Sequence, residues 1–302
     1  MINTGNPLFS HKFTADPTVL LYDQKIYLYT GRDEAPPGTQ DYIMRSWLCF
    51  SSADLITWEE HPMPLQASDF SWASGDAFAS CVIFNKQHFY WFAAVSHRHI
   101  PGKAIALGIS ETPTGPFRDA IGSALVTGND IPFNKNPMAN LDPSVIIDTD
   151  GQAYIFWGNQ QCYFAKLSND MLSLQGKIST IELPGFSEGA HVFKHNEWYY
   201  LTYGYGSPEK VAYAMSGSIH GPWVFKGILN ELAGNCETNR PAIIGFKGKD
   251  YFFYHNGSLK DGGSHRRSVC VDYLHYNPDG TIKRVIMTSE GITPAIPRLI
   301  NS

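Results

Sequence analysis

The sequence predicts an all-β fold, and more specifically a five-bladed β-propeller. Three observations lead to this prediction. One motif recurs five times along the 302 residues, turn-forming residues separate every apolar run, and no stretch of a dozen residues keeps the spacing of a helix. Aromatic residues make up 14% of the chain, which is typical of strands and of surfaces that stack on flat apolar ligands.

Each copy of the repeat contains, in order, a polar or charged residue, a small residue or proline, an apolar run, a short turn and an aromatic run. The apolar and aromatic runs of one copy are predicted to be paired strands, because both have strand length and a turn joins them. The five pairs of runs are residues 15–19 with 26–29, 75–79 with 89–92, 141–145 with 153–157, 187–192 with 198–201, and 239–243 with 251–254. Five sets of about four strands fit a propeller, whereas a sandwich does not need one motif five times.

Further segments complete the predicted blades. Residues 51–58, 110–117 and 216–223 resemble outer strands or hairpins, and the last two contain Gly-Pro turns. Residues 268–273 are predicted to form another inner strand. We expect the whole chain, residues 1–302, to be one five-bladed propeller domain, because all-β folds often reach this length as a single unit.

Composition and charge exclude several classes of function. The net charge is -5, which argues against a protein that binds nucleic acid by neutralising phosphates. The longest apolar run, from Phe89 to Val95, is far too short to span a membrane. Hydrophobic residues make up 43% of the chain and charged residues 17%, so a large core is expected. We therefore expect neither a nucleic-acid nor a membrane partner.

Two further features concern thiols and location. The five cysteines are scattered and form no C-x-x-C pair, so we expect buried free thiols rather than disulfides or a zinc site. Residues 1–7 contain no charged-then-apolar segment of the kind that begins a secretory signal. We expect a cytoplasmic protein if the chain is complete, and a periplasmic or secreted one if a signal peptide has been removed.

The residues that begin the five copies are Asp16, Asp76, Asp142, Glu188 and Arg240. In a propeller the first strand of each blade lines the central axis, so these residues should converge at one mouth of the channel. An aspartate before proline is, taken alone, usually a turn or cap residue. Four carboxylates together are costly to bury unless they are used or paired. Glycoside hydrolysis needs closely grouped carboxylates, because one carboxyl protonates the leaving oxygen while another stays ionised.

At these positions the sequence resembles family 43 of the glycoside hydrolases. Its three signatures resemble residues 15–17 (ADP), 141–144 (LDPS) and 187–191 (SEGAH). The resemblance spans nearly the whole chain and also covers residues 51–58, 115–117, 221–223, 239–241 and 254–255. It implies a five-bladed propeller with arabinofuranosidase, xylosidase, arabinanase or related activity, and with no required cofactor.

The resemblance also implies roles for three carboxylates. Asp16 would be the general base that activates water, and Glu188 the general acid that protonates the leaving oxygen. Asp142 would raise the pKa of that acid and orient it. Members of the family invert the anomeric carbon, so base and acid should lie about 6.5–9.5 Å apart to leave room for a water. Glu237 is a rival for the acid, although it precedes the leading position of its blade by three residues.

Three other polar residues are candidates for the sugar pocket. By resemblance, Arg267, which is preferred over Arg266, would hold a sugar hydroxyl or the carboxylates. His255 would lie in the central channel without direct catalysis. The resemblance also allows a structural calcium ion there, although no acidic loop with calcium-binding spacing is present. Asp76 is expected either to contact a sugar hydroxyl or to form a structural pair.

Three aromatic residues, Phe13, Trp72 and Phe186, shortly precede leading residues of the repeat. We expect at least one of them to stack on a sugar, and core packing between blades is the alternative for each.

Together with these residues, the resemblance implies an inverting, exo-acting glycosidase that acts on arabinose- or xylose-containing oligosaccharides or polysaccharides of plant hemicellulose or pectin. α-L-Arabinofuranosidase is favoured, and β-xylosidase is close behind. Two alternatives stay open. One is a retaining fructosyl hydrolase or transferase propeller, which would have arginine where this chain has Leu141. The other is a glycan-binding propeller without catalysis, which would not need all three carboxylates.

Overall fold

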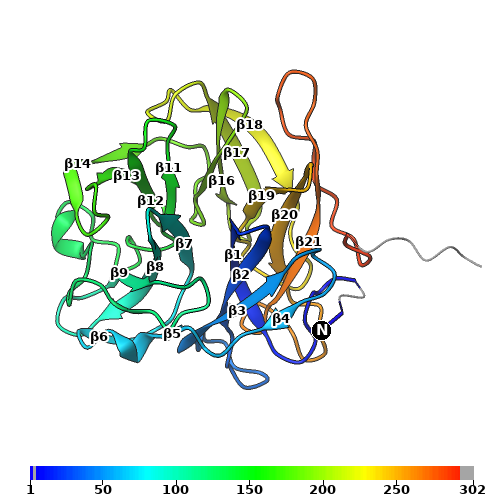
Figure 1. Cartoon of the computed structure of the whole chain (residues 1–302), viewed down its shortest axis with the longest axis horizontal. Helices are drawn as coiled ribbons and strands as arrows, with labels where there is room; N and C mark the ends of the chain where they lie inside the picture. Colours follow the sequence, from blue (N-terminus) through cyan, green and yellow to red (C-terminus); the bar gives the residue numbers. More distant parts are fainter. Residues whose placement is uncertain (3–4, 293–302) are drawn as a thin grey trace, which may run out of the picture.

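The computed structural model describes residues 1–2 and 5–292, which form five sheets arranged as the blades of a β-propeller (Figure 1). The predicted all-β fold and the predicted number of blades are therefore confirmed. Within this part of the chain, the only regular elements other than strands are two 3-10 helices, η1 (Ala67–Asp69) and η2 (Gly128–Asp130). Residues 3–4 and 293–302 of the predicted domain lie outside the described residues.

The strands follow the five copies of the repeat in chain order. The first sheet contains β1 (Thr14–Tyr22), β2 (Lys25–Arg32), β3 (Ser46–Ser52), β4 (Glu59–Glu60) and β5 (Leu65–Gln66). The second contains β6 (Ala73–Gly75), β7 (Ser80–Asn85), β8 (His88–His97), β9 (Lys103–Ser110) and β10 (Arg118–Asp119). The third contains β11 (Ser144–Ile147), β12 (Ala153–Trp157), β13 (Cys162–Leu167) and β14 (Leu174–Ile181).

The last two sheets differ in their number of strands. The fourth contains β15 (His191–His195), β16 (Trp198–Tyr205), β17 (Lys210–Ser216) and β18 (Val224–Asn230). The fifth contains β19 (Ala242–Phe246), β20 (Lys249–Asn256) and β21 (Ser268–Leu274). The prediction that residues 268–273 form an inner strand is wrong, because β21 pairs with β20 and is the third strand of its sheet.

The innermost strands are β1, β7, β11, β15 and β19, and each contacts its two neighbours around the axis (Figure 1). The predicted outer segments 51–58, 110–117 and 216–223 are the turns that lead from the third strand of a blade to its outer strand. In the first of these turns, Ser52 Oγ accepts a hydrogen bond from Leu55 N at 2.7 Å, and Asp54 Oδ1 accepts one from Ile56 N at 2.8 Å. Short polar side chains therefore satisfy the backbone of the turn.

Aromatic side chains fill the space between adjacent blades. Between the first and second blades, Trp47 and Trp91 are fully buried, and the ring of Tyr29 meets that of Trp91 edge-on at 4.9 Å. Each ring of this size removes about 150–250 Å² from water, so the aromatic runs of the repeat hold neighbouring blades together.

All five cysteines are buried and free, as expected. No helix among the described residues has the length and apolar character needed to cross a membrane.

The N-terminal segment closes the ring against the last strand. Leu8 N donates a hydrogen bond to Val269 O at 2.8 Å, and Thr14 N donates one to Arg267 O at 2.9 Å. Val269 N donates in return to Thr14 Oγ1 at 3.0 Å. The start of β1 is thereby fixed beside the start of β21, and Asp16 lies two residues further along β1.

Candidate active site

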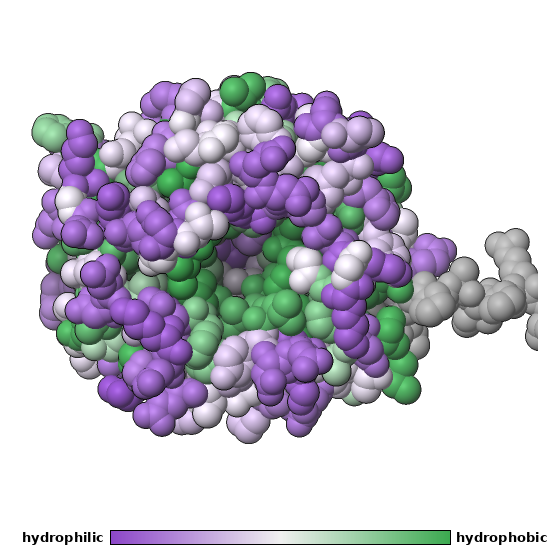
Figure 2. Space-filling model, turned by 45° about the horizontal axis from the view of Figure 1, so that its top comes forward, coloured by the Kyte–Doolittle hydropathy of each residue, from purple (hydrophilic) through white to green (hydrophobic). Residues whose placement is uncertain are grey.

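A cavity of about 270 Å³ lies where residues from all five blades meet. The face shown in Figure 2 is hollowed near its centre, and hydrophobic residues cover part of the wall. The residues that line the cavity are Asp16, Tyr42, Met44, Phe78, Ala79, Met138, Leu141, Asp142, Ser187, Glu188, Ser207, Glu209, Glu237, Thr238 and Arg267. The structure therefore brings together Asp16, Asp142, Glu188 and Arg267, and it places the rival acid Glu237 on the same cavity.

A repeated backbone conformation occurs at the leading aspartates. Asp16, Asp76 and Asp142 have φ angles of 50°, 61° and 55°. This left-handed region is unusual for residues other than glycine, although aspartate tolerates it better than most. In the fourth blade the residue with this conformation is Gly189, with φ of 71°. Glu188 therefore precedes the equivalent position by one residue.

Backbone pairing supports this offset. Gly204 N donates a hydrogen bond to Glu188 O at 2.8 Å, just as Gly158 N donates one to Leu141 O at 2.9 Å in the third blade. Glu188 is thus equivalent to Leu141 rather than to Asp142. The prediction that Glu188 shares the register of the aspartates is wrong by one residue, yet its side chain lines the same cavity.

Asp16 lies on the part of the cavity formed by the first and fifth blades. Its Oδ1 accepts a hydrogen bond from Arg267 Nη1 at 3.0 Å, and the two side chains are 10% and 4% exposed. A buried guanidinium at this distance forms a charge-assisted hydrogen bond that fixes the orientation of the carboxylate. Among the described residues, none donates a hydrogen bond to Asp16 Oδ2, so this oxygen is available to a ligand.

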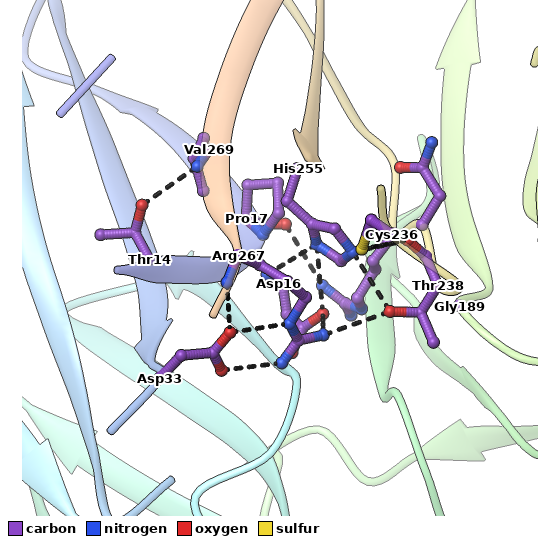
Figure 3. A network of polar contacts seen from close by, with 12 residues as sticks. Thr14, Asp16, Pro17, Asp33, Gly189, Cys236, Thr238, His255, Arg267 and Val269 are labelled. Atoms are coloured by element: carbon purple, nitrogen blue, oxygen red, sulfur yellow. Dashed lines mark hydrogen bonds and ion pairs between the residues drawn. The ribbon is translucent and has the colours of Figure 1, made fainter. Parts of the chain in front are cut away.

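His255 lies next to Asp16 (Figure 3), and its side chain is fully buried. Its Nδ1 accepts a hydrogen bond from Asp16 N at 3.2 Å, and its Nε2 lies 2.9 Å from Thr238 O. Burial, followed by the charge of Arg267, lowers the pKa of His255 to about 3. The ring is therefore neutral, and it orients the backbone of Asp16 without exchanging a proton.

Glu188 lies on the fourth blade in a contrasting environment. The side chain is half-buried, and its Oε2 accepts a hydrogen bond from Asn159 Nδ2 at 2.7 Å. Burial raises the pKa of Glu188 well above its usual value, and the nearby carboxylates of Asp142 and Glu209 raise it further. Glu188 therefore keeps a proton at a pH where an ordinary glutamate has lost it.

The side chain of Asp142 binds the backbone of the fourth blade. Asp142 Oδ2 accepts a hydrogen bond from Gly189 N at 2.8 Å, directly beside Glu188. Burial raises the pKa of Asp142 to about 6, and the nearby charge of Arg240 opposes this shift. Asp142 thus holds the backbone next to Glu188 and adds negative charge close to it.

Glu209 is a cavity residue that sequence reasoning missed. It lies in the turn between β16 and β17, is 4% exposed, and its Oε2 accepts a hydrogen bond from Asn239 N at 3.0 Å. Burial raises the pKa of Glu209 to about 7, although hydrogen bonds from Ser187 and Asn239 act in the opposite direction. Glu209 lies outside the repeated motif, so the pattern of the repeat contains no signal for it.

Two of the predicted polar residues, Asp76 and His255, are not among those that line the cavity. Asp76 forms an ion pair with Lys103 Nζ at 2.6 Å and lines a neighbouring hollow. Lys103 Nζ also lies 3.9 Å from the centre of the Phe78 ring. Arg266 Nη1 donates to Ala35 O, whereas Arg267 reaches the cavity. The ion pair between Asp76 and Lys103 is the structural pairing that was one alternative for Asp76.

The three predicted aromatic residues are not among those that line the cavity. The Phe13 ring faces the Arg266 guanidinium, whose carbon lies 4.2 Å from the centre of the ring. Trp72 Nε1 donates a hydrogen bond to Asp119 Oδ2 at 3.0 Å, and the Phe186 ring lies 5.6 Å from that of Tyr203. The larger apolar side chains on the cavity are instead Met44, Phe78, Met138 and Leu141, with Tyr42 beside them. Side-chain direction at these positions depends on tertiary packing, which the repeat does not specify.

The surroundings of His255 do not suit a calcium ion. Calcium requires several oxygen ligands, whereas both ring nitrogens of His255 are occupied by protein partners and two arginines, Arg240 and Arg267, lower its pKa. Within residues 1–2 and 5–292, no group of three or more His, Cys, Asp and Glu side chains could hold a metal ion.

Comparisons with known proteins identify the family of this chain. Residues 4–282 match the family described as "Glycosyl hydrolases family 43". The chain is 28% identical to an arabinoxylan arabinofuranohydrolase from Bacillus subtilis over 97% of its own length, but it spans only 66% of that protein. It is 27% identical to a β-D-galactofuranosidase from Aspergillus niger, over 95% of this chain and 86% of that protein.

A solved structure of higher identity points to the same family. An α-L-arabinofuranosidase from Clostridium thermocellum is 33% identical, with a TM-score of 0.79, and the match covers 95% of this chain and 98% of that one. The cavity residues Asp16, Asp142 and Glu188 lie inside the region of the family match. The chain therefore belongs to family 43 of the glycosyl hydrolases, a family of glycosidases.

Proposed function

We propose that this protein is an inverting, exo-acting glycosidase that removes terminal α-L-arabinofuranosyl groups from plant hemicellulose or pectin oligosaccharides. Asp16 is the general base, Glu188 is the general acid, and Asp142 raises the pKa of the acid and orients it. The observation that supports this proposal most directly is the shared cavity, in which an arginine-paired carboxylate and a proton-retaining carboxyl face the same space. We also propose that residues 1–302 form one catalytic domain.

The reaction breaks one bond and forms one bond at the anomeric carbon. Asp16 Oδ2 removes a proton from a water molecule while the oxygen of that water attacks the carbon. Glu188 donates its proton to the glycosidic oxygen, which leaves as a hydroxyl of the remaining oligosaccharide. Attack and departure occur on opposite faces of the sugar, so the configuration inverts, and the carboxyl groups should lie about 6.5–9.5 Å apart.

The environments of the two groups suit these roles. A base must be ionised before it can accept a proton, and Arg267 pairs with Asp16. An acid must be protonated near the working pH, and burial together with Asp142 and Glu209 raises the pKa of Glu188. After each turnover the proton on Asp16 passes to solvent, and Glu188 takes up a new one.

The size of the cavity favours removal of single sugars. Its volume of about 270 Å³ is below the range of roughly 300–1,000 Å³ that is usual for drug-sized ligands. Apolar walls from Met44, Phe78 and Met138 suit the carbon face of a sugar ring, and the carboxyl oxygens of Glu209 suit its hydroxyls. Such a small space accommodates one terminal residue better than the middle of a chain.

The named relatives favour a furanoside over a pyranoside. The proteins from Bacillus subtilis, Aspergillus niger and Clostridium thermocellum are named for arabinofuranose or galactofuranose, both five-membered rings. Hydrolysis of a β-xyloside is the second candidate, because the same three carboxylates would serve it.

The test is activity on a panel of nitrophenyl α-L-arabinofuranoside, β-D-galactofuranoside and β-D-xyloside, followed by linkage-defined arabinoxylan oligosaccharides. We expect the arabinofuranoside to give the highest kcat/KM. Proton NMR of the first product should show the anomer opposite to that of the substrate. A protein that binds these oligosaccharides without turnover, or that releases the retained anomer, would contradict the proposal.

A further inference from the structure

Asp33 is a buried carboxylate outside the cavity and outside the repeated motif. It follows β2 directly, and its side chain is only 1% exposed. Its Oδ2 accepts hydrogen bonds from Arg267 N at 2.8 Å and from Arg267 Nε at 2.9 Å. Its Oδ1 accepts one from Arg267 Nη2 at 3.0 Å. All three contacts are to one residue, 234 positions away in the chain.

These contacts fix the arginine on two sides (Figure 3). The Nε and Nη2 edge of the guanidinium meets Asp33 in a bidentate arrangement, which defines both its position and its plane. The remaining Nη1 donates to Asp16 Oδ1 at 3.0 Å. The guanidinium also lies 4.9 Å from the centre of the Tyr42 ring. Arg267 is therefore shared between a carboxylate inside the cavity and one behind it.

Because Arg267 pairs with both Asp16 and Asp33, the net charge next to Asp16 differs from that of a simple ion pair. An arginine paired with Asp16 alone would place a full, buried positive charge on the proposed base and would make it a poor proton acceptor. Asp33 offsets that charge, so the three groups together keep one net negative charge. Arg267 can then hold Asp16 Oδ1 by geometry while Oδ2 accepts the proton.

We propose that Asp33 is a positioning residue for the proposed base: it orients Arg267, and through Arg267 it sets both the direction and the basicity of Asp16. This inference rests on the proposed function, because it assumes that Asp16 activates water. Asp33 does not line the cavity, so it does not touch the sugar.

The effect of an Asp33 variant on the pH profile has to be separated from the effects of the other charged or titratable groups around Asp16. These groups come from every blade except the second, and they are Arg267, His255, Arg240, Asp142, Glu188, Glu209, Tyr42 and Cys236. Apart from Arg267 itself, none of these side chains is hydrogen-bonded to the guanidinium edge that Asp33 occupies. A change at Asp33 therefore reaches Asp16 through Arg267.

The experiment compares Asp33→Asn and Asp33→Glu with a matched control, Asp272→Asn. Asp272 lies in the fifth blade and, like Asp33, is buried. It accepts hydrogen bonds from Tyr254, Asn6 and Thr288, and it does not line the cavity. For each variant we would measure kcat and KM on the best substrate, the pH profile of kcat/KM and the melting temperature.

We expect Asp33→Asn to lower kcat by about 10²-fold, the cost of a misplaced catalytic group, with little change in KM. The acidic limb of its profile should move to lower pH, because the guanidinium charge on the base is no longer offset. Asp33→Glu restores the charge but not the geometry, so its profile should return to that of the wild type while kcat stays reduced. Asp272→Asn should lower the melting temperature and leave kcat and the profile unchanged.

The outcomes separate this inference from the proposed function. If Asp33→Asn loses only thermal stability, as the control does, Asp33 is structural and the inference fails. If Asp33→Asn does not fold, an Asp33→Glu variant with wild-type kcat overturns the inference, and one with reduced kcat at an unchanged melting temperature supports it. An inactive wild type, or full activity in Asp16→Asn, would instead overturn the proposed function.

Discussion

The two sides of the cavity treat a carboxylate in opposite ways. On the side formed by the first and fifth blades, Asp16 meets a buried arginine, and a second carboxylate, Asp33, offsets part of that charge. On the side formed by the third and fourth blades, Glu188 meets two other carboxylates and the neutral amide of Asn159. The same chemical group thus faces a cation on one side and anions on the other.

This difference teaches how one cavity can hold an acid and a base together. Asp16 is buried and Glu188 is half-buried, so neighbouring charges act on each of them more strongly than they would in water. The neighbours decide which carboxylate keeps its charge and which keeps its proton. The roles proposed for Asp16 and Glu188 follow from this asymmetry, and removing one neighbour at a time tests it.

The largest effect should come from removing the base. Asp16→Asn leaves a group that cannot accept a proton from water, so kcat should fall by about 10⁴-fold, the upper range for general base catalysis. Steady-state kinetics on an arabinoxylan oligosaccharide measures this loss. Retention of most of the activity, with Asp272→Asn equally active, would mean that the arginine-paired side does not supply the base.

Removal of the acid should have a smaller effect that depends on the leaving group. Glu188→Gln should lower kcat on natural oligosaccharides by about 10²–10³-fold. The loss should be much smaller on a nitrophenyl glycoside, whose leaving group needs no proton. Glu237→Gln is the matched control on the same cavity. If it shows this dependence and Glu188→Gln does not, the acid has been misassigned.

Removal of one neighbour should change the pH dependence rather than abolish activity. In Glu209→Gln, one of the negative charges that raises the pKa of Glu188 is absent. The pKa of Glu188 should fall, so the alkaline limb of kcat/KM should move to lower pH, while the rate at the optimum changes by less than about tenfold. An alkaline limb at the wild-type position would show that Glu209 does not influence the acid.

The smallest effect concerns stability. Burial raises the pKa of Glu209 from 4.5 to about 7, so between these values the folded state binds more protons than the unfolded state. Stability due to this group therefore decreases as the pH rises through that window. Relative to wild type, Glu209→Gln should gain stability from pH 4.5 to 7, by about 3 kcal/mol at most. Urea unfolding of both proteins at several pH values measures the difference, and a constant difference would contradict it.

Much of the architecture was predictable because the fold repeats. Five copies of one motif indicated five blades, and the axis of a propeller explains why Asp16, Asp142 and Glu188 line one cavity. The offset of Glu188 was not predictable, because the left-handed residue of the fourth blade is Gly189, where the first three blades have aspartate. A periodic pattern identifies strands well, but it tolerates a shift of one residue at their ends.

Residues outside the repeat could not be identified in this way. Asp33 directly follows a strand, and Glu209 lies in a turn. Each gains its role from residues distant in the sequence, Arg267 in one case and Asn239 in the other. Phe13, Trp72 and Phe186 illustrate the converse, because their positions suggested a sugar platform while their rings pack elsewhere.

The closure of the ring has a consequence for how the protein gains activity as it folds. Asp16 and Asp33 belong to the first blade, and the arginine that joins them precedes the last strand. Strands can form within each blade early, but this arginine reaches its partners only when the two ends of the propeller meet, at a large cost in chain entropy. During refolding, turnover should therefore return later than β-sheet circular dichroism, and it would serve as a direct reporter of the final closing step.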